Sequence, residues 1–260
     1  MSGVARIKVA VRDGLPAAWQ VPAKYWHARL SRTLEPEMAL LPHLVPSGGR
    51  AIDVGGNYGA YAVALAGLGA RVEVFEPHRA CLRALGAWAR GRTRVTIHPY
   101  ALSDQAGEAE LAIPVEADGT EHDAAGSIAA SVNAGVVRTH RVAVRTLDAF
   151  AFPDAALIKI DVEGHEAAVI EGALATIAAS RPALLVEIEQ RHRADPIATS
   201  FARIEALGYG GWFLRDGTLV PVARFDAAVH QRADALGQGG YHNNFLFLAR
   251  DRPYPGLPRA

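Results

Sequence analysis

The stretch that decides the fold is "AIDVGGNYGAYAVALA", residues 51–66. An apolar run reaches Asp53, a Gly-Gly-Asn-Tyr-Gly turn follows, and an alanine-rich segment with helical spacing comes next. Gly55, Gly56 and Gly59 let the backbone bend sharply and approach a ligand without clashes from Cβ atoms. In an open α/β sheet, ligands bind beyond the carboxyl ends of the strands. The stretch therefore predicts a strand, a ligand-binding turn and a helix, in that order.

Apolar, strand-like stretches alternate with helical ones along most of the chain. Strands are expected in "RVEVFEP" (71–77), "RVTIHPYALS" (94–103), "LIKIDVEG" (157–164) and "PALLVEIE" (182–189), and helices over 58–68, 78–90, 165–179 and 198–207. This alternation predicts an α/β fold with right-handed βαβ units, a mostly parallel sheet and helices on both faces. Residues 210–222 indicate a strand pair around Asp216-Gly217, and 243–250 a final strand. No helical pattern separates these last strands, so an antiparallel edge hairpin is expected.

Composition and charge limit the classes of protein to which the chain can belong. The 260 residues fit one large domain, or one domain with a small appendage. The 27 basic and 27 acidic side chains cancel, so no basic excess points to nucleic acid. The first residues, "MSGVARIKVAVRDGLPAAW", lack the apolar core of a signal peptide, and no apolar run is long enough to span a membrane. We therefore expect a cytoplasmic protein without a nucleic-acid partner or a membrane span.

The pattern divides the chain into three parts. Residues 1–48 contain a helical stretch that breaks near Pro36 and indicate an N-terminal cap, 49–250 carry the regular α/β pattern, and 251–260 form a tail. Within the domain, the pattern lapses over 114–140, which is rich in Gly, Ala, Ser and Asp. This stretch is long for a connection in a compact domain. It is expected to be either a surface loop with a short hairpin or an active-site lid.

The glycine turn departs from the G-x-G-x-x-G fingerprint of dinucleotide-binding folds. Asn57 stands where that fingerprint has its second glycine, which admits the pyrophosphate. Asp53 lies just before the glycines, where a carboxylate would repel a pyrophosphate and would suit a ligand with a cationic amino-acid end. The alternative role of Asp53 is to cap the following helix.

Two further strand ends carry polar residues that fit an adenosine. Glu76 ends the second strand, where a carboxylate accepts hydrogen bonds from ribose hydroxyls. Ser103 and Asp104 follow the third strand and could accept from an adenine amino group. An adenosine, a positive centre and an amino-acid tail without phosphate together indicate S-adenosylmethionine. The alternatives are a solvated strand end for Glu76 and a turn residue for Asp104.

Six motifs along the chain, taken together, are similar to those of a known family. They are "AIDVGGNYGAYAV", "VFEPHRACLRAL", "ALSDQAGEAEL", "LIKIDVEGHEAAVIEGA", "PALLVEIE" and "NNFLFL". Over residues 35–248 this set resembles the FkbM family of S-adenosylmethionine-dependent methyltransferases, and "KIDVEGHEAAVIEGA" is its most specific member. The turn reads GGNYG where the family more often has GANIG, which leaves the cofactor assignment intact. Residues 1–34 and 114–140 match poorly, so we expect the choice of acceptor to reside there.

The resemblance implies the class I methyltransferase fold, a Rossmann-like α/β fold. Its mostly parallel sheet has seven strands, of which the last is antiparallel. It also implies O-methylation of a hydroxyl on a sugar, a glycolipid or a polyketide-type natural product, and it places Asp161 near the transferred methyl group. The expected cofactor-binding residues are Asp53, Gly55, Gly56, Asn57, Gly59, Glu76, Ser103, Asp104 and Asp161.

The segment "KIDVEGHE", residues 159–166, supplies candidates for the chemistry. Methyl transfer to an alkyl hydroxyl requires alignment of the acceptor and help in removing its proton. A buried carboxylate needs a partner, so Asp161, and Glu187 at the end of the neighbouring strand, are hard to explain as core packing. His165 has an ordinary pKa near neutrality, which suits a general base, although it could instead be a first-turn residue facing solvent. We expect Asp161 to position charge, His165 to accept the proton, and Glu187 to orient the acceptor or a cation.

A metal site is a weaker possibility. Asp161 and Glu187 could share a hard divalent cation such as Mg²⁺, with His242 or Asn244 nearby. The sequence has no dense ligand motif such as H-E-x-x-H, so a metal is not favoured. His242, Asn243 and Asn244 precede the last strand and are either a polar wall of the acceptor pocket or a turn. Lys159 and Asp161 lie two positions apart on one strand and therefore point the same way.

Two other functions stay open beside the methyltransferase. A non-catalytic domain of the same fold could bind S-adenosylmethionine without turnover, because fold alone does not fix function. An NAD-dependent oxidoreductase is less favoured, because Asp53 and Asn57 both count against a pyrophosphate.

Overall fold

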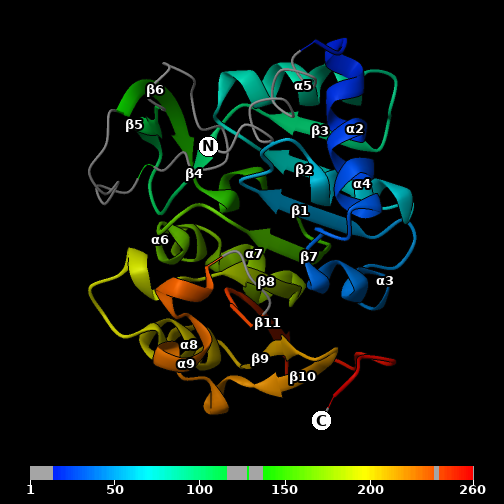
Figure 1. Cartoon of the computed structure of the whole chain (residues 1–260). Coiled ribbons are helices and arrows are strands. Elements are labelled where there is room, and N and C mark those ends of the chain that lie inside the picture. Colours follow the sequence, from blue (N-terminus) through cyan, green and yellow to red (C-terminus); the bar gives the residue numbers. More distant parts are fainter. Residues whose placement is uncertain (1–13, 116–127, 129–136, 237–239, 260) are drawn as a thin grey trace.

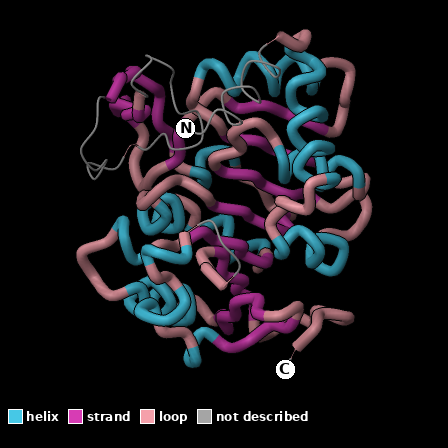
Figure 2. The backbone as a smooth tube through the Cα atoms, in the orientation of Figure 1, coloured by secondary structure: helices cyan, strands magenta, loops and turns pink. Residues whose placement is uncertain are grey.

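The computed structural model describes residues 14–115, 128, 137–236 and 240–259. Its described strands form a large sheet in the order β10-β9-β11-β8-β7-β1-β2-β3 and a small sheet in the order β4-β6-β5. Figures 1 and 2 show the large sheet running through the molecule, with helices packed along it.

The strands of the large sheet are β1 (Arg50–Val54), β2 (Arg71–Phe75), β3 (Val95–His98), β7 (Ala155–Ile160), β8 (Ala183–Glu187), β9 (Tyr209–Arg215), β10 (Thr218–Pro221) and β11 (Asn244–Ala249). The small sheet contains β4 (Ala101–Leu102), β5 (Gly107–Pro114) and β6 (Val137–Arg145). The α-helices are α2 (Ala17–Leu30), α3 (Leu41–Leu44), α4 (Ala60–Gly67), α5 (Arg79–Ala89), α6 (Glu166–Glu171), α7 (Leu174–Ser180), α8 (Ile197–Ala206) and α9 (Ala227–His230). Short 3₁₀ helices occupy Pro36–Leu40, Leu147–Phe150, Gln190–His192, Val222–Arg224 and Ala233–Ala235.

The directions of the strands confirm the predicted fold class. The five strands β3, β2, β1, β7 and β8 pair in parallel, and β11 runs antiparallel to β8 and β9. One strand more than the expected seven is present, because β10 pairs antiparallel with β9 at the edge. Asp216 and Gly217 join these two strands, both with positive φ, which suits a tight two-residue hairpin turn.

Both faces of the sheet are covered, which explains the nearly continuous burial of the central strands. On one face, Ile52 and Ile158 pack in a core shared with α6, α7 and α8. On the other face, Ala51 and Leu157 pack in a core shared with α2, α3, α4 and α5. The alternation of neighbouring residues between the two cores follows from the two-residue period of a strand.

The N-terminal helix packs on the second of these layers. The helix α2 contacts α4 and α5, and it ends at Leu30, before Pro36 begins a 3₁₀ helix. The predicted break near Pro36 is therefore present. None of the helices in the described part of the chain combines the length and the apolarity needed to cross a bilayer.

The predicted loop at 114–140 overlaps a hairpin at both of its ends. The strands β5 and β6 pair antiparallel from Gly107 opposite Val144 to Pro114 opposite Val137. Residues 116–127 and 129–136 lie outside the described residues, so the choice between a surface loop and a lid stays a prediction.

Candidate functional site

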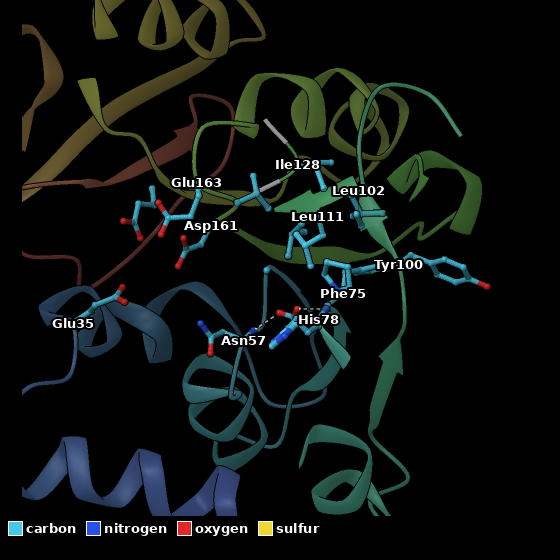
Figure 3. A pocket seen from close by; sticks show the side chains of 17 residues that line it. Glu35, Asn57, Phe75, His78, Tyr100, Leu102, Leu111, Ile128, Asp161 and Glu163 are labelled. Carbon is cyan, nitrogen blue, oxygen red and sulfur yellow. Dashed lines mark hydrogen bonds between the residues drawn. The ribbon is translucent and has the colours of Figure 1, made fainter. Parts of the chain in front are cut away.

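A cavity of about 310 Å³ lies beyond the carboxyl ends of β1, β2, β7 and β8. Figure 3 shows carboxylates toward one end of it and mostly apolar side chains toward the other. Its lining comprises Glu35, Val54, Gly55, Asn57, Phe75, Glu76, Pro77, His78, Tyr100, Ala101, Leu102, Leu111, Ile128, Asp161, Val162, Glu163 and Glu187. The volume lies in the range of small-molecule sites.

The glycine turn forms the floor of this cavity and has little room for side chains. Gly55 has a φ of +77°, and a Cβ atom there would lie 1.8 Å from the backbone oxygen of Asp161. A Cβ on Gly56 would lie 2.2 Å from a methyl of Val74. Gly59 precedes α4, also with positive φ, and packs close to Leu85. Gly55 therefore has no room for a side chain because the backbone of the neighbouring loop lies against it, whereas Gly56 and Gly59 are confined by the side chains of Val74 and Leu85.

Glu76 is held in place by backbone amides. Its Oε2 accepts from the Asn57 amide at 2.7 Å, and its Oε1 accepts from the His78 amide at 2.7 Å. Each carboxylate oxygen can accept more than one hydrogen bond, so acceptor capacity remains toward the cavity. Burial raises the pKa of Glu76 to about 7, against the two amide hydrogen bonds, which lower it.

Asp53 lines a second cavity that adjoins the first. This cavity, about 210 Å³ in volume, is lined by Asp53, Lys24 and Lys159, and shares Glu35, Gly55, Asn57 and Asp161 with its neighbour. Asp53 is buried, and within the described structure its Oδ2 has no hydrogen-bond partner. Burial raises the pKa of Asp53 to about 7, and Lys159 lowers it. A buried carboxylate oxygen without a partner is unfavourable, so it fits a ligand donor such as an ammonium group.

Ser103, Asp104 and His165 form a group of their own beside the cavity. The Ser103 hydroxyl donates to Asp104 Oδ1 at 2.8 Å and lies 2.9 Å from His165 Nε2. Because a hydroxyl has one hydrogen, Nε2 of His165 is the donor in the second contact. None of the three lines either cavity, whereas Ala101 and Leu102, just before Ser103, do. The structure does not bring His165 together with Asp161 and Glu187 at the cavity, and burial lowers the pKa of His165.

Lys159 stands at the centre of the acidic end. Its side chain is only 1% exposed, and its Nζ lies 3.6 Å from Asp161 Oδ2, 4.0 Å from Glu187 Oε2 and 3.2 Å from Asn244 Oδ1. Burial lowers the pKa of Lys159, but the nearby carboxylates, with Asp161 foremost, raise it well above its ordinary range. Lys159 therefore places a cationic group within 4.0 Å of both Asp161 and Glu187.

Asn244 and Glu35 complete this network from distant parts of the chain. The Asn244 amide donates to Glu35 Oε2 at 3.0 Å, and the Tyr61 hydroxyl donates to the same oxygen at 2.6 Å. Asn243 donates to Glu187 Oε1 at 2.6 Å. Burial, followed by Asp161, raises the pKa of Glu187 well above its ordinary value.

Glu163 adds a further carboxylate to the cavity wall. Glu163 lies in the loop between β7 and α6. Its φ of +51° is uncommon for a residue with a side chain. Burial, then Asp161, raises the pKa of Glu163 to about 7. Four carboxylates, those of Glu35, Asp161, Glu163 and Glu187, therefore lie at this end of the cavity.

The sequence left open a divalent cation shared by Asp161 and Glu187, and the structure places the side chain of Lys159 close to both. The ammonium of Lys159 lies between Asp161 and Glu187, and no group of three or more His, Cys, Asp or Glu in the described ranges is arranged to hold a metal ion. Of the two expected neighbours, Asn244 belongs to the network, whereas His242 packs against Phe213 with ring centroids 5.4 Å apart.

Sequence reasoning missed Glu35 and gave Lys159 no role. A lysine in a strand that is otherwise apolar was a usable signal, because a buried charge needs partners. Glu35 lies in the N-terminal part that was expected to be a cap, and its contact to Asn244 spans 209 positions. No local pattern indicates a contact over that separation.

The chain is similar to several solved structures of methyltransferases. A crystal structure of an FkbM methyltransferase from Methylobacillus flagellatus is similar at 17% identity and a TM-score of 0.50, over 93% of this chain and 57% of that chain. A TehB-like methyltransferase from Corynebacterium glutamicum (13%, TM-score 0.44, covering 88% and 96%) and a precorrin-6Y methyltransferase from Geobacter metallireducens (10%, 0.45, 81% and 85%) are more distant. No curated protein matches the chain.

The first of these similarities supports the fold alone, and this chain spans little more than half the length of that protein. The methyltransferase FkbM domain matches residues 53–209, which is more than half of the chain and runs from the glycine turn to the start of β9. That range contains the turn, Glu76 and the Lys159 segment. The chain belongs to the FkbM methyltransferase family.

Proposed function

We propose that this chain binds S-adenosylmethionine and transfers its methyl group to a hydroxyl of a sugar, a glycolipid or a polyketide-type natural product. The observation that carries the proposal is buried Asp53, whose Oδ2 has no hydrogen-bond partner among the described residues and which lines a cavity next to the one lined by Glu76. One cavity pair thus offers an acceptor for an amino group and another for ribose hydroxyls.

The residues present fit the cofactor that the family implies. Glu76 would accept from the ribose hydroxyls, Asp53 would pair with the amino group, and Asn57 lines both cavities. Phe75, Leu102 and Leu111 would form apolar walls around the adenine. Ser103 and Asp104 lie behind this lining, so a contact from them to the adenine would require their side chains to enter the cavity. When bound, the cofactor supplies a methyl group already activated by its sulfonium charge.

The acidic end suits a polyhydroxylated acceptor. Carboxylates accept hydrogen bonds from hydroxyl groups, and four of them line this end, with the buried ammonium of Lys159 beside them. An acceptor with phosphate or carboxylate groups near the reacting hydroxyl would meet like charge. We therefore expect neutral or amine-bearing polyols to be better acceptors than acidic ones.

For the proton, we propose Glu187 as the base and Asp161 as the group that positions the hydroxyl. Burial raises the pKa of Glu187, which brings it closer to the working pH of a general base. Both line the cavity, whereas His165 contacts Ser103 beside it. This arrangement supports a different division of roles from the one expected from the sequence, in which His165 was the base.

Calorimetry tests the cofactor. The chain should bind S-adenosylmethionine and not NAD, and Glu76→Ala should weaken binding by about 1–3 kcal/mol, the cost of losing hydrogen bonds to a charged group. Glu171→Ala, on the exposed side of α6, is the matched control and should bind like the unchanged chain. Binding of NAD, or equal losses in both variants, would contradict the proposal.

Methyl transfer to a panel of polyols tests the chemistry. Glu187→Gln should lower kcat about 10²–10⁴-fold and remove the rise of the rate with pH, with cofactor affinity retained. Glu171→Gln should leave both unchanged. If His165→Phe gives the large loss instead, the base is His165. Cofactor binding without turnover on any acceptor would favour the non-catalytic alternative.

A further inference from the structure

The helix α2 presents an apolar stripe to solvent. Trp19 is 66% exposed, Trp26 is 53% exposed and Leu30 is 82% exposed. Their spacing of seven and four positions places them on one face of an α-helix. The opposite face buries Tyr25, and it packs Val21 into the core shared with α4 and α5. Large apolar side chains in contact with water on one face indicate an interaction surface.

The exposed charged side chains of α2 and of the turn after it, within the described residues, are basic. Residues 14–34 contain no Asp or Glu, and α2 and the turn after it expose Arg29 and Arg32. Figure 1 shows α5 beside α2, and the two helices contact each other. Residues 77–103, which include α5, also contain no Asp or Glu, and they expose Arg79, Arg83, Arg90, Arg92 and Arg94. A chain with zero net charge has therefore gathered cations on the α2–α5 layer.

We propose that the α2–α5 layer docks on the surface of a membrane that contains anionic lipids. Tryptophan and leucine on one helix face, flanked by arginine, are the composition of a helix that lies in the interface between headgroups and acyl chains. The basic side chains of α5 extend the contact with anionic headgroups. Docking of this kind needs no membrane-spanning helix.

Charge decides between this partner and two others. A symmetric dimer through α2 would bring the same arginines of two copies together, and like charges oppose that contact. A nucleic acid would satisfy the arginines but would leave Leu30 exposed to water. An anionic bilayer satisfies both the charges and the apolar stripe.

Docking also places the second cavity close to the lipid. The inner side of α2 contributes Lys24 and Ala28 to that cavity, while its outer side carries Trp19 and Trp26. This consequence, unlike the docking itself, rests on the proposed function: the acceptor would be a hydroxyl of a lipid-linked molecule held at the membrane surface.

Flotation of the full chain with vesicles tests the docking. The chain should float with phosphatidylcholine vesicles that contain phosphatidylglycerol, and far less with pure phosphatidylcholine, and added salt should weaken the binding. The triple variant Trp19→Ser/Trp26→Ser/Leu30→Ser should bind at least about tenfold more weakly. The matched control Val229→Ser/Leu236→Ser removes side chains of similar exposure elsewhere and should bind like the unchanged chain.

A second variant keeps the test independent of the tryptophans. Arg32→Gln/Arg83→Gln/Arg90→Gln should also bind at least about tenfold more weakly, because each cation near an anionic surface adds to the attraction. Urea unfolding should match in all variants, since the side chains are exposed. The proposal is overturned if the chain ignores anionic vesicles, if the control loses as much as the triple variant, or if the stripe mediates self-association or RNA binding instead. Cofactor affinity measured without vesicles separates this failure from a failure of the proposed function.

Discussion

The two ends of the cavity are held by different kinds of contact. At the turn end, Glu76 is fixed by the backbone amides of Asn57 and His78, and the turn itself is fixed by the backbone of the next loop. At the acidic end, Lys159 and Glu35 are fixed by side chains from separate elements. Backbone contacts survive changes of side chain, whereas a network of charged side chains depends on each member. The acidic end should therefore be the more fragile of the two.

The largest effect is expected at Lys159. Replacement by Met in Lys159→Met removes the buried ammonium and leaves Asp161 and Glu187 facing each other, and breaking a buried ion pair costs about 3–5 kcal/mol. Urea unfolding measures the loss. Lys24→Met, an exposed lysine that lines the same second cavity, is the control and should change stability by less than about 1 kcal/mol.

A double variant shows whether charge causes the loss. In Lys159→Met/Glu187→Gln one of the unbalanced carboxylates is gone, so part of the stability should return. If the two losses simply add, the network is not coupled, and the contrast between the two ends is wrong.

A smaller effect is expected at the turn end, and only from a change that touches the backbone contact. Gly55→Ala combines a positive φ with a Cβ that would meet a backbone oxygen, and should cost about 2–3 kcal/mol. Gly86→Ala should change the free energy of unfolding in the opposite direction. Gly86 is exposed within α5 with nothing near its Cβ position, so alanine should stabilise the chain by about 0.5–1 kcal/mol. Equal effects of the two substitutions would show that the turn is not tight.

A further effect of about 1 kcal/mol is a pH dependence at Asp53, which lines the second cavity. Its pKa is about 7 in the folded chain, above the ordinary value of 3.8, so the folded chain binds more protons between these values. Its contribution to the free energy of unfolding is thus full at low pH and falls as the pH rises through about 7. Between about pH 5 and about pH 6, the free energy of unfolding of the unchanged chain should fall by about 1 kcal/mol relative to that of Asp53→Asn. A constant difference across this interval would mean that Asp53 is not desolvated.

The same contrast explains what the sequence could reveal. The turn and Glu76 were predictable because they lie at strand ends, where the order of elements alone brings residues to one edge. Asp161 and Glu187 were found for the same reason. His165 was expected at the cavity from its place in the motif, but the start of α6 directs it to Ser103. Glu35 was missed, because its partners Tyr61 and Asn244 become neighbours only after the chain has folded.

The backbone contact between Gly55 and Asp161 has a consequence for protein engineering. The amide of Asp161 also donates to Val54 at 3.0 Å, so the turn and the loop after β7 form one rigid joint. Glu35 and Asn244 approach the cavity from elsewhere, on separate elements. The N-terminal segment or the start of β11 could therefore be exchanged in a designed variant to admit a new acceptor. The spacing between the turn and Asp161 would stay as it is.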